Sequence, residues 1–221
     1  HRVDRRQRQM CIRDSFTGAL TLGDLIVPTT VANLALTGTG NSFTSQVAFQ
    51  NDGTLILGNN AADTFAFNGG LTETAVGVVT LAAAISSTND AISFGDVTLG
   101  ANTSLDTNAT TTAGDLTIGA VTGAGFNLTL STGDNIAGAD VTGSSVNPTG
   151  DLSLADIGGT ATFTGALTLG DLVVPATVAN LALTGTGNSF TSQVAFLNDG
   201  TLTLGNNAAD TFAFNGGLTE T

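Results

Sequence analysis

Basic side chains are missing from nearly all of this 221-residue chain. Residues 16–221 contain no Lys, Arg or His, and all five arginines lie within residues 1–13. Of the 18 acidic residues, Asp4 and Asp14 precede Phe16, which leaves sixteen carboxylates in the rest of the chain with no opposing charge. Because a surface without cations cannot neutralise phosphates, we expect no nucleic-acid partner. No apolar run approaches the roughly 18 residues that a membrane-spanning helix needs, so we also expect no membrane insertion.

The side chains that most often carry out catalysis are also absent. Residues 16–221 lack Cys, Tyr and Lys as well as His, which leaves Ser, Thr and carboxylates without a usual base to activate them. Most of the sixteen acids stand singly in turn-like positions rather than in pairs. The aromatic residues are twelve Phe, without the Trp or Tyr on which sugar rings stack. We therefore expect that the protein is not an enzyme and has no catalytic, cofactor-binding or metal-ligating residue.

The first fifteen residues differ from everything that follows. Residues 1–15 read HRVDRRQRQMCIRDS and hold every arginine together with the single His, Met and Cys. Their RQMCIRDS end resembles translated sequencing-adapter read-through. We therefore predict that residues 1–15 are an artefactual or disordered leader, and we set them aside when reasoning about the fold.

A long internal duplication organises the rest of the chain. Residues 16–74 return as residues 163–221, offset by 147 positions and identical at 55 of 59. Repetition on this scale is typical of arrays of stacked units. We predict one full 147-residue unit over residues 16–162 and the start of a second, near-identical unit over residues 163–221. The four differences are mild: Ile26/Val173, Thr29/Ala176, Gln50/Leu197 and Ile56/Thr203.

A finer repeat runs through both copies. Each Gly-Asp or Gly-Asn dipeptide is 17–20 residues from the next, apart from one double step of 37 residues. Such a pair marks a turn, since glycine tolerates a positive φ and the following side chain caps nearby amides. Apolar residues often follow the glycine at the second and fourth positions, as in a short strand with one inward face. The sequence therefore predicts an all-β protein, a parallel β-solenoid (β-helix) with about 18–19 residues per coil and minimal helix. The glycines are Gly23, Gly40, Gly58, Gly95, Gly114, Gly133, Gly150, Gly170, Gly187 and Gly205.

An antiparallel β-sandwich is the alternative fold. Its turns would be about 8–12 residues apart and would need no single register along the chain. The constant register of the dipeptides favours the solenoid, in which equivalent strands stack coil upon coil. The one helix-like run, Thr80–Ser86 (TLAAAIS), is short enough to form a strand.

Repeats near 19 residues, rich in Gly, Asn, Asp and Thr and poor in Lys, Cys and Trp, resemble a class of large secreted bacterial surface proteins. These include filamentous-haemagglutinin-like adhesins and autotransporter passengers built of β-strand repeats. The resemblance covers residues 16–221 and rests on composition and period, not on a diagnostic motif. It implies an extracellular or cell-surface location, secreted or attached to a bacterial outer membrane. It also implies a structural stalk or spacer that projects a binding region outside this segment. The alternative is a repeat module that itself binds a glycan, calcium or a host protein.

One segment is similar to a calcium-binding repeat. Residues 58–67 (GNNAADTFAF), present again in the second copy, approach the nonapeptide G-G-x-G-x-D-x-U-x. Asp63 occupies the acidic position, but Asn59 and an alanine replace two of the three glycines, and the motif does not recur on adjacent coils as that calcium cage requires. We therefore interpret the segment as a polar corner in which Asn59 and Asn60 cap the backbone and Phe65 enters the core, and we expect no cofactor.

Neighbouring repeats of the same chain are the partners that a solenoid requires. Because exposed end coils have unpaired strand edges, we also predict end-to-end self-association of an isolated segment. The identity of any ligand on a host or environmental surface stays open.

Overall fold

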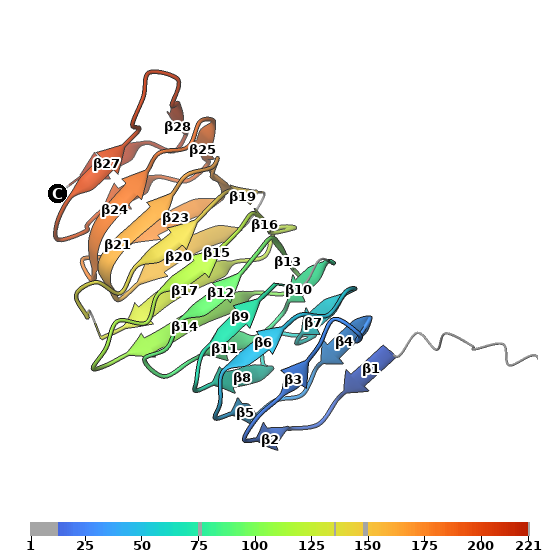
Figure 1. The fold of residues 1–221 in the computed structure, drawn as a ribbon. Coiled ribbons are helices and arrows are strands. Elements are labelled where there is room, and N and C mark those ends of the chain that lie inside the picture. The colour runs from blue at the N-terminus through green and yellow to red at the C-terminus, as the bar shows by residue number, and fades with distance from the viewer. Residues whose placement is uncertain (1–12, 75–76, 135, 148–149, 221) are drawn as a thin grey trace, which may run out of the picture.

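The computed structural model describes residues 13–74, 77–134, 136–147 and 150–220. Within these ranges every regular element is a strand, and the strands pair in parallel to form a β-solenoid of about nine turns (Figure 1). This arrangement confirms the predicted parallel β-solenoid and excludes the antiparallel sandwich. The helix-like run Thr80–Ser86 falls on two strands, β10 (Val79–Leu81) and β11 (Ala84–Ser86).

Three walls, sheets A, B and C, form the rod, and the chain visits them in that order in each coil. Sheet D continues the wall of sheet A, because Val146 of its last strand bridges Leu167, just before the first strand of sheet D. Sheet A holds β1 (Arg13–Phe16), β4 (Asn33–Leu36), β7 (Leu55–Leu57), β10, β13 (Val97–Leu99), β16 (Val121–Thr122) and β19 (Val146–Asn147). Sheet D holds β22 (Thr168–Leu169), β25 (Asn188–Phe190) and β28 (Phe212–Phe214).

Sheets B and C are the longer walls. Sheet B holds β2 (Thr21–Leu22), β5 (Asn41–Phe43), β8 (Thr64–Phe67), β11, β14 (Thr103–Ala109), β17 (Leu128–Gly133), β20 (Asp151–Ala155), β23 (Asp171–Val174), β26 (Val194–Phe196) and β29 (Leu218–Glu220). Sheet C holds β3 (Ile26–Val27), β6 (Val47–Phe49), β9 (Leu71–Glu73), β12 (Ile92–Phe94), β15 (Leu116–Ile118), β18 (Val141–Gly143), β21 (Ile157–Phe163), β24 (Val178–Leu183) and β27 (Leu202–Leu204).

Apolar side chains fill the rod as ladders, because alternate residues of each strand point inward. β7 shows the pattern: Leu55 and Leu57 are fully buried, while Ile56 between them is partly exposed. Phenylalanines fill the coils near the amino-terminal end, where the rings of Phe43 and Phe67 stack with centroids 5.0 Å apart. One inward column of sheet A consists of Leu34, Leu55, Val79, Val97, Val121 and Val146.

Hydroxyl side chains line the outward column of sheet C. The strands of this sheet each present one central residue to solvent, and five successive coils carry Thr or Ser there. β-Branched threonines stacked in register stabilise a sheet through cross-strand contacts. This explains why the chain is rich in Thr while it lacks long polar side chains. The five residues are Thr72, Ser93, Thr117, Thr142 and Thr162.

Each coil is longer than the turn marks indicated. Paired residues lie between 18 positions apart, as for Val79 and Val97, and 25 apart, as for Val121 and Val146. The duplicated Phe16 begins its copy in β1 and reappears in β21, which is 20 strands or 6⅔ three-strand coils later. Spread over 6⅔ coils, the 147 residues give about 22 residues per coil. The predicted 18–19 residues per coil, with eight coils in 147 residues, is therefore wrong.

The physical reason is that a Gly-Asp or Gly-Asn turn serves at any corner of the coil. Gly58 follows a strand of sheet A, Gly114 follows a strand of sheet B, and Gly95 follows a strand of sheet C. Successive dipeptides are less than one coil apart, so the marks move from corner to corner along the rod. Their spacing is regular, but it does not measure the coil.

The two copies of the duplicated block occupy different walls of the rod. Phe16 lies in sheet A but its copy Phe163 lies in sheet C, and Leu22 lies in sheet B but its copy Leu169 lies in sheet D. Since 6⅔ coils are not a whole number, the second copy starts one wall further around the triangle. Identical sequence therefore packs equally well against different walls.

The leader boundary needs a correction. Residues 1–12 lie outside the described residues, but Arg13–Ser15, which the sequence assigned to the leader, form the beginning of β1. They pair in register with Asn33–Ala35 of β4. Pairing of this kind uses main-chain groups, so a change in side-chain composition at Phe16 does not set where the first strand begins.

Candidate functional site

The calcium-like segment is a corner closed on itself. Asp63 is 3% exposed, and its carboxylate accepts hydrogen bonds from the Asn59 amide at 2.8 Å and from the Thr39 hydroxyl of the preceding coil at 3.2 Å. Asn60 accepts the Ala62 amide at 2.9 Å. The carboxylate is thus directed at protein donors rather than at an ion. The described ranges contain no group of three or more His, Cys, Asp or Glu side chains placed to hold a metal.

The predicted polar corner is confirmed in part. Asn60 caps a backbone amide as expected, and Phe65 is buried at 1% exposure. However, the Asn59 side chain accepts only from the neighbouring Asn60 side chain, at 2.6 Å, and it is the Asn59 amide that is capped, by Asp63. Sequence reasoning treated Asp63 as a ligand candidate and missed its role as the cap.

The same corner in the second copy shows the electrostatic consequence. The Asp210 carboxylate accepts hydrogen bonds from the Asn206 amide at 2.7 Å, from the Asn207 amide at 3.1 Å and from the Thr186 hydroxyl at 3.1 Å. Chiefly because of the bond from the Asn206 amide, the pKa of Asp210 is lowered from its ordinary value of 3.8. The carboxylate of this corner is therefore held in its ionised form.

Several turn residues join one coil to the next instead of lying free in solvent. The Asp96 carboxylate accepts the Ala120 amide at 2.7 Å, and the Asp115 carboxylate accepts the Asp140 amide at 3.1 Å. Asp140 in turn accepts the Thr160 amide at 2.7 Å. The side chains satisfy amides one coil further along, which the sequence did not indicate because it predicted bonds within each turn.

Asn41 and its copy Asn188 make the most extensive of these links. Asn41 is 2% exposed; its Oδ1 accepts the Leu20 amide at 3.0 Å, and its Nδ2 donates to the carbonyls of Gly38 and, at 3.3 Å, Thr64. These three partners belong to three successive coils. Asn188 repeats the arrangement. An inward-pointing asparagine after a Gly is the sequence signal that marks this link.

Glu73 is a buried carboxylate that the sequence gave no reason to single out. It is 7% exposed and follows Leu71 at the spacing of two, so it shares the inward face of β9. Its Oε2 accepts the Gly95 amide of the next coil at 3.0 Å, whereas its Oε1 is buried with no hydrogen-bond partner among the described residues. Glu73 is thus another link between coils, incompletely satisfied.

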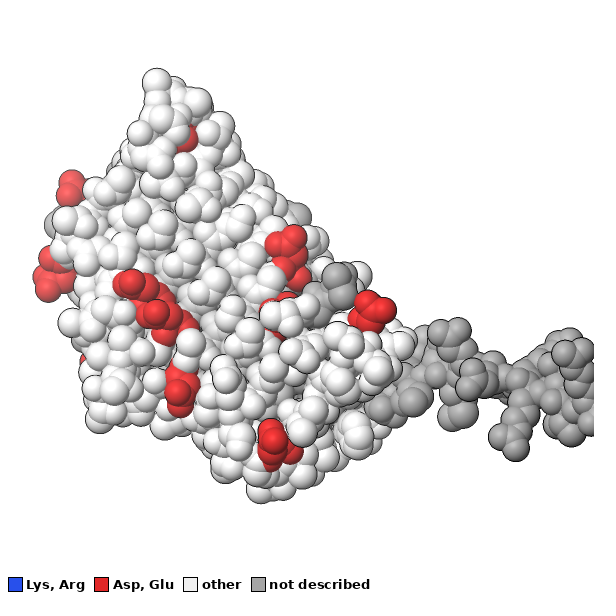
Figure 2. Space-filling view, in the orientation of Figure 1, with Lys and Arg blue, Asp and Glu red and all other residues white. Residues whose placement is uncertain are grey.

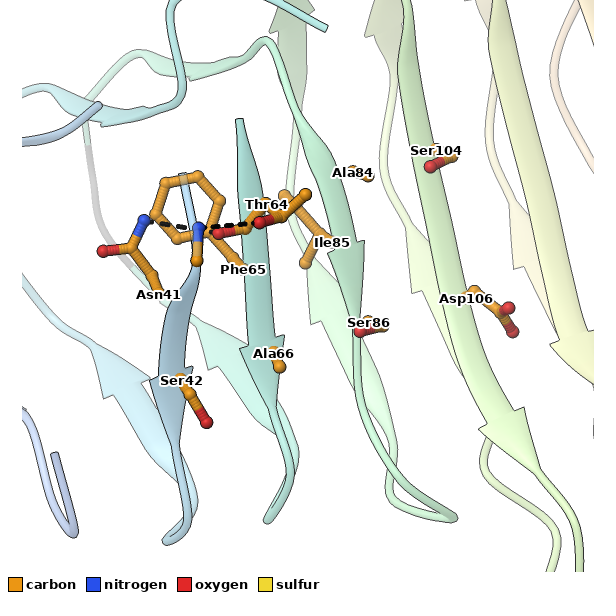
Figure 3. A pocket seen from close by; sticks show the side chains of 11 residues that line it. Asn41, Ser42, Thr64, Phe65, Ala66, Ala84, Ile85, Ser86, Ser104 and Asp106 are labelled. Carbon is orange, nitrogen blue, oxygen red and sulfur yellow. Dashed lines mark hydrogen bonds between the residues drawn. The ribbon is translucent and has the colours of Figure 1, made fainter. Parts of the chain in front are cut away.

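A shallow trough of about 420 Å³ crosses the outer face of sheet B and is the best candidate for a ligand-binding surface (Figure 3). Its floor consists of short side chains in register across four strands, including Ser42, Ala66, Ser86 and Asp106. A second depression of about 300 Å³ adjoins it and shares Ser104.

The chemistry of this trough is hydrogen bonding rather than catalysis. Asp106 is the only ionisable residue that lines it, and its Oδ1 already accepts the Asn108 amide at 2.8 Å and the Ser131 hydroxyl at 3.1 Å. The hydroxyls of Ser42, Ser86 and Ser104 have no imidazole, amine or thiolate beside them in the trough. The arrangement suits a neutral polar ligand and offers no activated nucleophile.

The outer surface carries acidic charge in separate places. Figure 2 shows carboxylates as isolated groups on an otherwise uncharged face, and the sequence has no Lys or Arg after Arg13. Across the described parts of the chain no helix is long and apolar enough to cross a membrane. Comparisons with models of protein families, with curated proteins and with solved structures found no match to this chain.

Proposed function

We propose that this chain is a structural spacer, the stalk segment of an extracellular, adhesin-like bacterial repeat protein that projects a binding region lying outside the segment. The observation that supports this best is the behaviour of the duplicated block. Leu34 pairs with Leu55 in sheet A, and their copies Leu181 and Leu202 pair in the same register in sheet C. A block that keeps its pairings on any wall lengthens the rod wherever it is copied.

The residues that the duplication copies also favour a spacer over a repeated site. They are core residues such as Phe67, coil-linking residues such as Asn41 and corner residues such as Asp63, and each contributes to the stack itself. A surface with acidic groups and no Lys or Arg beyond Arg13 is soluble and resists non-specific adhesion to anionic surfaces. Both properties suit a secreted or surface-attached stalk without enzymatic activity.

The spacer role predicts a defined increase in length for each unit. With strands about 4.8 Å apart, 6⅔ coils add about 32 Å to the rod. We expect that inserting a further copy of residues 16–162 lengthens the particle by this amount without widening it, as measured by small-angle X-ray scattering. An unchanged maximum dimension, or a second particle lying beside the first, would contradict a spacer.

The surface location is tested separately. Antibodies raised against the duplicated block, which is present twice in the chain, are expected to label intact source cells or their culture medium. Labelling that appears only after the cells are opened would rule out the extracellular assignment while leaving the length measurement untouched.

The sheet B trough supports a second candidate function, a module that binds a neutral glycan. Its Ser and Thr hydroxyls and its small Ala side chains offer hydrogen bonds and close approach, although no aromatic platform is present in it apart from the inward Phe65. Binding on a glycan array that is lost when Ser86 and Ser104 are replaced by Val would favour this function. No binding by the wild-type protein would remove it.

A further inference from the structure

The strands at the carboxyl-terminal edge expose side chains that the same sequence buries elsewhere in the molecule. Leu204 is 37% exposed and Leu218 is 46% exposed, whereas their copies Leu57 and Leu71 are 0% exposed. The local sequences are identical around these positions apart from Ile56/Thr203, so the difference comes from the coil above them. In the first copy that coil is present, and at the edge formed by β27, β28 and β29 the described residues supply none.

The interior of the molecule shows what fits this edge. In the first copy, β7, β8 and β9 are covered by β10, β11 and β12, with Val79 on Leu55, Ile85 on Phe65 and Ile92 on Leu71. All of these side chains are buried. Because β27, β28 and β29 are copies of β7, β8 and β9, the same apolar ladder would continue from them.

Main-chain groups are matched in the same way. The Leu55 amide donates to the Val78 carbonyl at 3.0 Å, and the Ala82 amide donates to the Leu57 carbonyl at 2.9 Å. The Gly95 amide donates to the Glu73 carboxylate at 3.0 Å. In the second copy the corresponding groups belong to Leu202, Leu204 and Glu220, at the open edge.

We propose that the edge formed by β27, β28 and β29 is a binding site for a strand triplet with the sequence of residues 77–96, which it takes up by parallel strand addition. Addition of this kind combines main-chain hydrogen bonds with side-chain pockets, so the inward ladder sets the specificity. The proposal does not depend on the location or the adhesin-like role of the protein.

The opposite edge has a different complement. Phe16 in β1 is 44% exposed, and its copy Phe163 is 0% exposed because β18 covers it, the ring lying against Gly143. The amino-terminal edge therefore matches residues 141–155, not the carboxyl-terminal edge. Simple head-to-tail contact between two copies of this chain brings together two edges that are paired nowhere in the molecule.

Two synthetic peptides of equal length test the site. Residues 77–96 are the expected ligand, and residues 138–157, which include β18 and β20, are the matched control from the same rod. We expect saturable binding of the first peptide to the full chain, with slowed amide hydrogen exchange over residues 202–220, and at least tenfold weaker binding of the control. Replacing both Leu204 and Leu218 with Asp is expected to abolish binding.

A covalent version removes the dependence on peptide solubility. Appending residues 75–96 after Thr221 is expected to slow exchange over residues 202–220 towards the rates of residues 55–73, and appending residues 138–157 is expected to leave it fast. Equal protection by both extensions would overturn the proposal, since strand addition would then be generic. Fast exchange with both extensions would overturn it as well, and slowed exchange that depends on protein concentration without any peptide would assign the edge to a second copy of the chain instead.

Discussion

A matched pair of leucines gives the sharpest test of how this rod is stabilised. Leu71 and Leu218 are the same residue in the same local sequence, but Leu71 is 0% exposed and Leu218 is 46% exposed. Replacing a fully buried leucine with alanine removes its transfer free energy and leaves a cavity, which together cost about 2–5 kcal/mol. At Leu218 only about half of the transfer term applies and solvent fills the space, so we expect about 1 kcal/mol.

The assay is urea denaturation of Leu71→Ala, Leu218→Ala and the unchanged protein, with the unfolding midpoint and the denaturant slope measured for each. The slope matters because a solenoid can fray from its ends, and a constant slope shows that the same amount of surface unfolds in each variant. We expect the midpoint to fall at least twice as far for Leu71→Ala as for Leu218→Ala. Equal shifts would refute the reasoning, since they would mean that β29 is as well covered as β9.

Three further changes test other parts of the structure. In Gly143→Ala the new methyl group would lie 2.5 Å from the Phe163 ring, so we expect a loss of about 1–3 kcal/mol by denaturation, whereas Gly18→Ala, with no atom within 4 Å of the new carbon, is the control expected to cost little. Asn41→Ala leaves buried backbone groups in three coils without a partner and is expected to cost about 2–3 kcal/mol, with faster amide exchange in all three coils; loss confined to one coil would count against the link. Because the folded-state pKa of Asp210 lies below 3.8, the stabilisation of its corner is complete above that pH and is lost as pH falls through the folded-state pKa; Asp210→Asn is expected to remove this dependence of exchange rates on pH, and a persistent dependence would contradict it.

Local patterns were sufficient to predict the class of fold. Alternation such as Leu55-Ile56-Leu57, glycine turns at regular intervals and the lack of strong helix formers all favour short strands with one inward face. A parallel stack follows because the register is constant and the repeats are long. The same patterns identified Phe65 as a core residue, since burial of alternate residues in a strand is a local property.

The candidate site was less predictable because it depends on which coils are neighbours. Asp63 was placed at the acidic position of a calcium-like motif, but its partner Thr39 lies 24 residues earlier and is brought to it by coil stacking. Glu73 looked unremarkable until the inward face of β9 was known. The trough joins Ser42, Ser86 and Asp106, whose sequence separations match no regular repeat.

By itself the sequence determined that the chain is a stack of short parallel strands, that it is duplicated with an offset of 147 residues, and that its surface beyond Arg13 has no basic groups. Only the tertiary structure decided the length of the coil and the wall on which each copy lies. The reason is geometric: a glycine turn can close any corner of a three-walled coil, so turn spacing does not reveal how many strands complete a circuit. The duplicated block is therefore seen to advance by 6⅔ coils and to turn onto a new wall once its strands are paired.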